Sequence, residues 1–319
     1  MELFTTFQIP PIDKEHQIDY QSKTMTIGSC FAKSLSQKME FYKFRSQANP
    51  FGVMFHPMAI ENLLRRAFKF ELFEEKDIFF HEDLWHSYEV HSECSMNDKE
   101  LMLSTLNQKL REFRDAIASA THIVITLGTA WAYRHLQSDV LVANCHKIPQ
   151  QEFQKEILSV VDVFDSLHRM RNFIRSINAY VRIIFTISPV RHLKDGFVEN
   201  QRSKSLLFTA LHEYLQDAKD DLQFYFPAYE VLMDELRDYR FYAEDLVHPS
   251  LQAIDFIWEK FKNAYIRESS YELMNEVSSI QTGLAHRPFN PDTEGHKIFL
   301  ENLNERMKSL QDKVSFIKF

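Results

Sequence analysis

The chain has 319 residues, of which 45% are apolar, and it carries a formal charge of -8 at pH 7. This length and apolar content favour one large hydrophobic core, with or without an appended segment, and exclude a largely disordered chain. The negative charge argues against broad binding to nucleic acid or to an anionic membrane. We therefore expect a small-molecule partner, and nothing in the composition indicates an oligomeric state.

Three cysteines, Cys30, Cys94 and Cys145, are odd in number and far apart, which predicts no disulfide framework and suits a reducing compartment. The N-terminal residues lack a basic segment followed by an apolar stretch, and no segment approaches ~18 consecutive apolar residues. We expect a soluble, cytoplasmic protein. Six glycines form neither a dinucleotide fingerprint nor a phosphate loop. No paired short ligand spacing indicates zinc, so we expect no cofactor and no metal.

In chain order, short β-rich runs alternate with longer stretches whose apolar residues recur at helical spacing. The expected strands are residues 23–28, 44–48, 122–128, 182–188 and 222–226, and the expected helices are residues 31–42, 57–70, 99–119, 151–180 and 202–220. The middle strands are apolar on both faces, as central parallel strands covered by helices are. This order predicts a three-layer αβα, doubly wound sheet of about five parallel strands.

Two insertions and a tail depart from this pattern. Residues 71–97 and 132–148 resemble hairpins near strand ends, where we expect them to roof a pocket. Beyond about residue 266 the chain becomes polar and helical, with a break at residues 285–291. We expect an α/β domain over residues 1–265 and a C-terminal helical extension over residues 266–319.

Chemically useful side chains follow three of the expected strands. They stand in the stretches Gly28-Ser29-Cys30, Gly128-Thr129-Ala130-Trp131 and Ser188-Pro189-Val190-Arg191-His192. The carboxyl ends of parallel strands meet at one edge of a sheet, so these residues are expected to line one crevice. A thiol or hydroxyl at the start of the first helix is well placed to attack a substrate.

Asp245 and His248 provide a carboxylate and an imidazole three residues apart. In a turn, the carboxylate can hold the tautomer of the imidazole while the other ring nitrogen faces a nucleophile, which is the arrangement that acyl transfer needs. The alternative is structural, with Asp245 as the N-cap of a helix that starts near Pro249.

The stretch Ile27-Gly28-Ser29-Cys30-Phe31-Ala32 resembles the signature of the GSCFA domain family. Further stretches of the same family stand in order along residues 20–260, namely Asn49-Pro50-Phe51-Gly52, Thr126-Leu127-Gly128-Thr129-Ala130-Trp131, Asn144-Cys145-His146-Lys147, Ser188-Pro189-Val190-Arg191-His192 and Arg237-Asp238-Tyr239-Arg240-Phe241-Tyr242. This family in turn is similar to the SGNH (GDSL-type) hydrolase superfamily. That resemblance implies a flavodoxin-like fold that hosts esterases, lipases, deacetylases and some acyltransferases.

The resemblance implies a role for each matching position. Cys30 takes the place of the nucleophile, with Ser29 as the alternative, although Ser29 also suits a helix N-cap and Cys30 a small buried side chain. His248 takes the place of the base and Asp245 orients it. The backbone N–H of Gly52 takes an oxyanion role, although Gly52 also reads as a plain turn glycine.

Two parts of the pattern remain open. The superfamily's third block carries an Asn whose side chain donates to the oxyanion, and this chain has Gly128-Thr129-Ala130-Trp131 instead. Losing such a donor costs ~10²–10³ in rate, so Thr129 or Asn144 is the expected replacement. Arg191 and His192, with Lys147, His146 and Trp131, form the expected substrate-binding set, in which Arg191 binds an anionic group. Alternatively, Arg191 pairs with a structural carboxylate, for which the candidates are Asp234, Glu235 and Asp238.

These observations predict a hydrolase that acts on an acyl ester or thioester through a Cys (or Ser), His and Asp arrangement. An acyltransferase that uses the same acyl-enzyme is the first alternative, because a thioester can pass its acyl group to another acceptor. A catalytically decayed small-molecule-binding protein is the second, because the Asn of the third block is missing.

Overall fold

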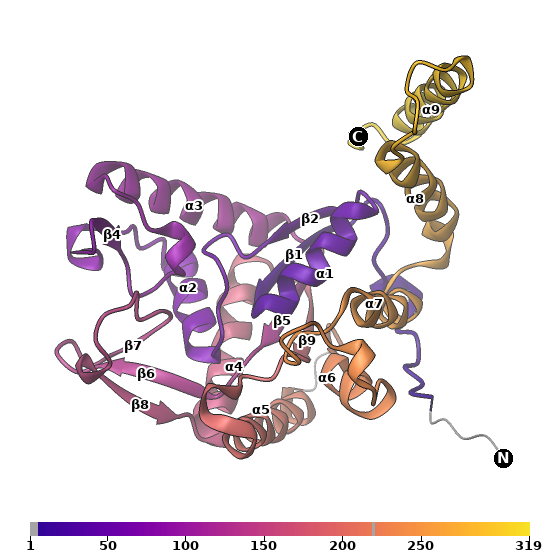
Figure 1. Cartoon of the computed structure of the whole chain (residues 1–319). Helices are drawn as coiled ribbons and strands as arrows, with labels where there is room; N and C mark the ends of the chain where they lie inside the picture. Colours follow the sequence, from indigo (N-terminus) through magenta and orange to yellow (C-terminus); the bar gives the residue numbers. More distant parts are fainter. Residues whose placement is uncertain (1–5, 219–220) are drawn as a thin grey trace.

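The computed structural model describes residues 6–218 and 221–319. Its central sheet has five parallel strands in the order β10-β9-β5-β1-β2 (Figure 1). All five expected strands are present, as β1 (Lys23–Gly28), β2 (Arg45–Ala48), β5 (His122–Leu127), β9 (Arg182–Ile187) and β10 (Gln223–Phe226). The expected doubly wound α/β fold is therefore confirmed. The end of the expected helix 202–220 reaches residues 219–220, which lie outside the described residues, as do residues 1–5.

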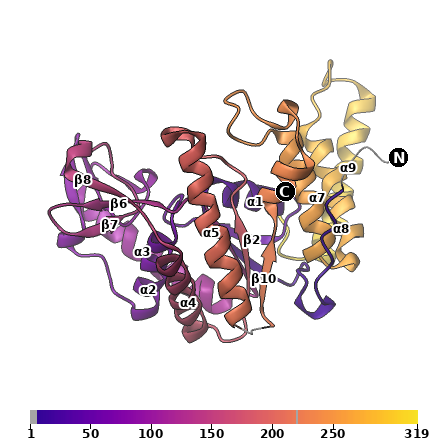
Figure 2. The same ribbon diagram turned by 90° about the horizontal axis from the view of Figure 1, so that it is seen from below.

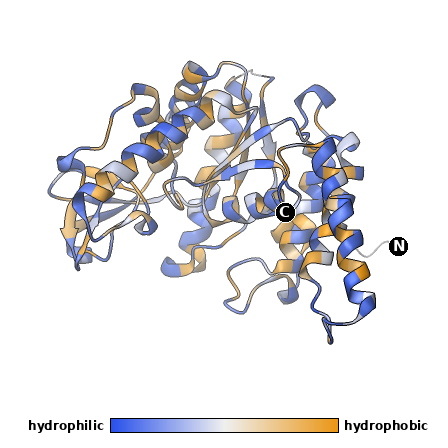
Figure 3. Ribbon diagram, turned by 90° about the horizontal axis from the view of Figure 1, so that it is seen from above, coloured by the Kyte–Doolittle hydropathy of each residue, from blue (hydrophilic) through white to orange (hydrophobic). Residues whose placement is uncertain are grey.

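Helices cover both faces of this sheet and form two hydrophobic clusters. In β5, Ile123 and Ile125 belong to the cluster under one face, and Val124 belongs to the cluster under the other. The first face is covered by α2 (Pro57–Lys69), α3 (Lys99–Ser119), α4 (Val160–Ile177) and α5 (Gly196–Ala218), and the second by α1 (Cys30–Phe41) and α7 (Leu251–Tyr265). Blue and orange residues alternate along these helices in Figure 3, as expected for helices with one buried face.

Short elements complete the connections. Single turns of 3₁₀-helix cover Lys14–His16, Glu75–Asp77, Ser92–Cys94, Gln150–Glu152, Leu193–Asp195, Tyr239–Phe241 and Glu268–Ser270, and α6 (Ala228–Glu230) runs into a π-helical segment, Val231–Glu235.

Both insertions are built of antiparallel strands. The first contains the hairpin of β3 (Phe79–His81) and β4 (Leu84–His86), and the second forms a three-stranded sheet of β7 (Val140–Val142), β6 (Trp131–His135) and β8 (Phe153–Ile157). The expected helix 151–180 is wrong in its first part, because residues 153–157 pair with β6. The helix α4 starts only at Val160, after a capping box formed by Ser159 and Asp162.

The C-terminal helices α8 (Tyr271–Ala285) and α9 (Glu294–Lys313) lie beyond α7 at one end of the molecule (Figure 1). The sheet of β6, β7 and β8 lies at the opposite end (Figure 2). Buried residues of both C-terminal helices, among them Val277 and Leu310, belong to the same hydrophobic cluster as Phe31 of α1. Within residues 6–218 and 221–319, no helix is long and apolar enough to cross a membrane.

The order of the strands reverses between β1 and β5. From β1 the chain moves outward to β2, then returns across β1 to form β5, β9 and β10 in turn. In open α/β sheets, ligands bind outside the carboxyl ends of the strands at such a switch point. Here those ends carry Gly28 and, one residue after β5, Gly128.

Candidate functional site

The turn from β1 into α1 depends on a glycine. Gly28 has φ of +130°, and a Cβ at this position would collide with the Thr126 carbonyl of β5. The next N–H, that of Ser29, donates to the same carbonyl at 3.0 Å. This close approach holds the start of α1 directly over the carboxyl end of β5.

Ser29 occupies the N-cap position of α1, but its side chain makes no capping hydrogen bond. The expected N-cap role of this side chain is therefore wrong. The residue is fully buried, and its Oγ has no hydrogen-bond partner in the described part of the chain. Its hydroxyl faces into the protein instead of closing the helix terminus.

Cys30 is the first residue of α1 and is partly exposed. Burial raises the pKa of its thiol, and the Asp245 carboxylate adds to this rise. The Lys204 cation and the N–H groups of Phe31 and Cys30 act in the opposite direction but do not reverse it. A thiol in this setting keeps its proton at neutral pH, so it needs a base before it can attack.

Asp245 and His248 form that kind of unit. The Asp245 Oδ1 accepts the N–H groups of Val247 and His248 at 2.9 Å, and Oδ2 lies 2.6 Å from His248 Nδ1. These hydrogen bonds lower the pKa of Asp245 to about 2. The alternative helix-cap role of Asp245 is wrong, because α7 is capped by Ser250, whose side chain accepts the Ala253 N–H.

Lys204 is a buried cation that connects the ends of two strands. Its Nζ donates to the carbonyl oxygens of Gly128 at 2.7 Å and Ser188 at 2.8 Å. Burial lowers the pKa of Lys204 to about 7, against the opposing effect of Cys30. Sequence reasoning missed this residue, although it shares the apolar face of its helix with Leu207 and Leu211, which is the signal that could have found it.

His192 follows β9, which lies on the opposite side of β5 from β1. Burial, with the charges of Lys204 and His248, lowers the pKa of His192 to about 3. Its ring meets Phe55 edge to face, and its Nε2 is buried without a hydrogen-bond partner among the described residues. The charges of Lys204 and Asp245 thus act on the pKa of Cys30, and those of Lys204 and His248 act on the pKa of His192.

Two of the three expected oxyanion residues make other hydrogen bonds through their donor groups, and the third is held through its side-chain oxygen. The Gly52 N–H donates to the Asn49 carbonyl at 2.8 Å in a turn packed against His91. The Thr129 Oγ1 lies 2.9 Å from Ser203 Oγ and accepts the Trp131 N–H. The side-chain oxygen of Asn144 accepts the His146 N–H at 2.8 Å.

Asn49, which the sequence analysis did not single out, has a free donor instead. Its Oδ1 accepts the Gly28 N–H at 2.8 Å, which fixes the orientation of the amide. Its Nδ2 is buried and has no hydrogen-bond partner among residues 6–218 and 221–319. The signal was present in the sequence, since Asn49 opens the Asn49-Pro50-Phe51-Gly52 stretch.

A cavity of about 270 Å³ opens beside His192. Thr129, Trp131 and Asn144 line it, together with Tyr133, Cys145, Lys155 and Lys194. The second insertion thus lines this cavity, as expected, whereas the first does not. Lys155 Nζ lies 4.4 Å from the centroid of the Trp131 ring and is paired with Asp195.

Three of the expected substrate-binding residues lie outside this cavity, namely Lys147, His146 and Arg191, the last of which lines a second cavity. Lys147 is exposed, with Nζ 3.9 Å from a Glu82 carboxylate oxygen. His146 is buried against His86, its Nε2 lies 2.7 Å from the Ser87 carbonyl, and burial lowers its pKa to about 4. In the described residues, no three His, Cys, Asp or Glu side chains come together to hold a metal ion.

A second cavity, of about 560 Å³, opens beside the Asp245 carboxylate. Arg191 lines it, with Nη2 2.8 Å from Met233 Sδ. The carboxylates considered for Arg191 are paired with other cations, as Asp234 with Arg237, Asp238 with Arg240 and Glu235 with Lys260. Among the described residues, Arg191 has no carboxylate partner.

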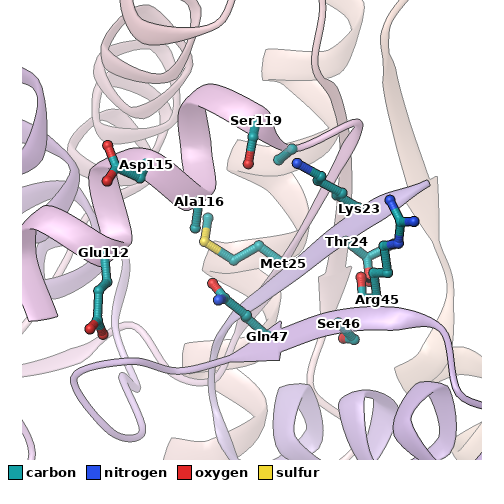
Figure 4. A pocket seen from close by; sticks show the side chains of 11 residues that line it. Lys23, Thr24, Met25, Arg45, Ser46, Gln47, Glu112, Asp115, Ala116 and Ser119 are labelled. Carbon is teal, nitrogen blue, oxygen red and sulfur yellow. Dashed lines mark hydrogen bonds between the residues drawn. The ribbon is translucent and has the colours of Figure 1, made fainter. Parts of the chain in front are cut away.

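A third hollow, of about 470 Å³, lies at the opposite edge of the sheet. It is lined by Lys23 and Arg45 at the start of β1 and β2, and by Glu112 and Asp115 of α3 (Figure 4). None of the residues singled out from the sequence lines it. The charged and nucleophilic groups described above are therefore concentrated at the carboxyl edge.

Comparisons with known proteins give two kinds of similarity. An acetyl esterase variant with an acetate ion is 16% identical, with a TM-score of 0.29, over 52% of this chain and 67% of the esterase. A carbohydrate esterase family 3 protein from Talaromyces cellulolyticus is 13% identical, with a TM-score of 0.28, over 52% and 66%. The chain thus spans about two thirds of each, and similarity this low supports no inference about activity.

No curated protein matches the chain significantly. The model of the GSCFA family matches residues 23–261, and that of the C-terminal domain of GSCFA domain proteins matches residues 277–319. The matched stretch includes Gly28-Ser29-Cys30, Gly128 and the Asp245 and His248 pair, and it covers well over half of the chain. The chain belongs to the GSCFA family.

Proposed function

We propose that this protein hydrolyses an acyl ester or thioester through a covalent acyl intermediate on Cys30. As the Cys30 sulfur attacks the carbonyl carbon, His248 takes the thiol proton and Asp245 stabilises the imidazolium. When the tetrahedral intermediate collapses, His248 returns the proton to the departing alkoxide or thiolate. His248 then removes a proton from water, whose oxygen attacks the thioester, and Cys30 is released with its proton restored.

The observation that carries this proposal is the contact of 2.6 Å between Asp245 Oδ2 and His248 Nδ1. It leaves the His248 Nε2 to act as the base, and the imidazole is half exposed, so a substrate can reach it. The same carboxylate raises the pKa of the Cys30 thiol, which supports an arrangement in which the pair serves that thiol.

Cys30 is a better nucleophile for this proposal than Ser29. The Cys30 side chain is partly exposed, whereas Ser29 is fully buried, so the thiol is the more accessible of the two nucleophiles. The N–H groups of Cys30 and Phe31 and the Lys204 cation favour the thiolate that forms during attack.

The test is turnover of acetyl and short-acyl aryl esters and thioesters, with mass spectrometry of acid-quenched samples. We expect an added acyl group on the peptide that contains Cys30, and a loss of at least about 10³ in kcat for Cys30→Ala. Cys94→Ala is the matched control, because that thiol is buried in the hydrophobic core.

Other outcomes reassign the chemistry. An acyl group that persists in Cys30→Ala and disappears in Ser29→Ala would move the nucleophile to Ser29. Unchanged turnover in both variants would overturn the proposal. Alcohols and amines added to the assay distinguish the transferase, which would form the acylated acceptor instead of the free acid.

A further inference from the structure

The proposed reaction places negative charge on the former carbonyl oxygen, and two of the expected donors for this charge, the Gly52 N–H and the Thr129 hydroxyl, make other hydrogen bonds. We propose that Asn49 and His192 supply the side-chain donors of the oxyanion site, through Asn49 Nδ2–H and His192 Nε2–H. This inference rests on the proposed function, because it names the groups that would stabilise its intermediate.

The two residues approach the Gly28-Ser29-Cys30 turn from opposite directions along the carboxyl edge of the sheet, because β2 lies on one side of β1 and β9 lies beyond β5 on the other. Asn49 follows β2 and contacts the turn through its Oδ1, 2.8 Å from the Gly28 nitrogen. His192 follows β9 and reaches the turn across Gly128. A Cβ on Gly128 would lie 3.3 Å from His192 Nε2, 3.2 Å from Ser29 Cβ and 2.8 Å from the Phe55 carbonyl oxygen, so the His192 ring packs close to the start of the turn.

Both donors are held in place and have no other use within the described residues. The amide of Asn49 is oriented by its bond to Gly28, and the loop at His192 is fixed by its N–H, which donates to Asn200 Oδ1 at 2.9 Å. Asn49 Nδ2 and His192 Nε2 are both buried without a partner among these residues. A buried donor without a partner is costly, and such groups occur where a ligand or an intermediate completes them.

The charge state of His192 suits this role. Burial and Lys204 keep its pKa at about 3, so the imidazole is neutral in the working range of pH. A neutral imidazole with its proton on Nε2 donates a hydrogen bond without offering a proton, whereas His248 is held beside a carboxylate. Donors that are fixed before the reaction and shielded from water stabilise an oxyanion strongly.

The experiment traps the oxyanion with 1,1,1-trifluoroacetone, followed by ¹⁹F NMR. The Cys30 sulfur adds to the carbonyl carbon, and the thiol proton moves by way of His248 to the new hydroxyl oxygen, giving a hemithioketal. Its hydroxyl ionises more easily when donors surround the oxygen. We expect His192→Leu and Asn49→Leu each to raise the pKa of this hydroxyl by about 2, with His192→Gln closer to the wild type.

Turnover of 4-nitrophenyl acetate gives a second readout. Each Leu variant is expected to lose about 10²–10³ in kcat with little change in KM, because the donor acts in the transition state. On the wild type, ¹⁵N-labelled histidine is expected to show the Nε2–H tautomer of His192 and a shift of that proton when the adduct forms. This measurement needs no variant to fold.

The outcomes separate the two proposals. An adduct that is lost in Cys30→Ala, with a hydroxyl pKa that neither Leu variant changes, would overturn the oxyanion assignment and leave the nucleophile intact. A change in only one variant would overturn the assignment of two donors. No adduct on the wild type would overturn the proposed function, and the oxyanion site with it.

Discussion

His248 and His192 lie in opposite surroundings. His248 is half exposed, and its Nδ1 lies 2.6 Å from the Asp245 carboxylate. His192 is largely buried against Phe55, next to the Lys204 cation, and burial lowers its pKa to about 3. In the proposed reaction the first imidazole acts as the base, with a carboxylate to stabilise the imidazolium, and the second stays neutral and donates a hydrogen bond.

This difference supports the two roles proposed for these histidines, a base for His248 and a hydrogen-bond donor for His192. The Asp245 carboxylate contacts the His248 ring, whereas burial, with the charges of Lys204 and His248, lowers the pKa of His192. Variants of His248, Asp245 and Lys204 test whether the two roles are separate, whether the Asp245 contact is needed for the base role of His248, and whether Lys204 is charged beside His192.

The largest effect is expected for His248→Ala. General base catalysis contributes about 10²–10⁴ in rate, and His192 is too weak a base to replace it, so kcat for 4-nitrophenyl acetate should fall by about that factor. The matched control is His286→Ala, which removes an exposed imidazole between α8 and α9. A loss below tenfold would show that the two histidines are interchangeable.

A smaller loss is expected for Asp245→Asn. The amide keeps an oxygen for the N–H groups of Val247 and His248, so the turn is retained, but it no longer stabilises an imidazolium. Because both side chains are half exposed, solvent screens part of the charge, and we expect a loss of about 10² in kcat/KM. A rate equal to that of the wild type would mean that the carboxylate only shapes the turn.

Much of this arrangement could be predicted from the sequence, and the reasons are local. Strands that are apolar on both faces identified the central sheet, and the spacing of Asp245 and His248 is enough for their contact, since they share one turn. The start of α4 was predicted wrongly because Phe153 and Ile157 stand four residues apart, which fits helical spacing, although residues 153–157 pair with β6.

The remaining site residues depend on contacts that no short stretch of sequence contains. Lys204 meets the Gly128 carbonyl from 76 residues away, and Asn49 meets Gly28 only because β2 lies next to β1. Ser29 had the residue type and position of an N-cap, yet the buried surroundings of the turn direct its hydroxyl inward. Side-chain direction at a strand end is set by the neighbouring strands.

The Lys204 charge can be measured through stability. In the folded chain the pKa of Lys204 is about 7, against ~10.4 in an unfolded chain. Between these values the unfolded state binds more protons, so this group makes the free energy of unfolding rise with pH, by at most about 1.4 kcal/mol per pH unit.

Lys204→Met should therefore flatten the increase of the unfolding free energy between pH 7 and pH 10. Urea unfolding at four pH values measures it, with both proteins carrying Cys30→Ala so that the thiol does not titrate. Equal slopes with and without Lys204 would show that the lysine carries the same charge in both states and that its pKa is not lowered in the folded chain.

The smallest effect is expected for a change of Arg191, because the two cavities differ in whether their cations are paired with carboxylates. Arg191, beside Asp245, has no carboxylate partner among the described residues, whereas Lys155 in the cavity beside His192 is paired with Asp195. An anionic group on the substrate should therefore bind on the His248 side. We expect Arg191→Gln to raise KM for 4-nitrophenyl hemisuccinate about fivefold, since a partly exposed ion pair contributes about 1 kcal/mol, and to leave KM for the neutral acetate unchanged. Lys194→Gln tests the other cavity, and a larger effect there would place the anion beside His192.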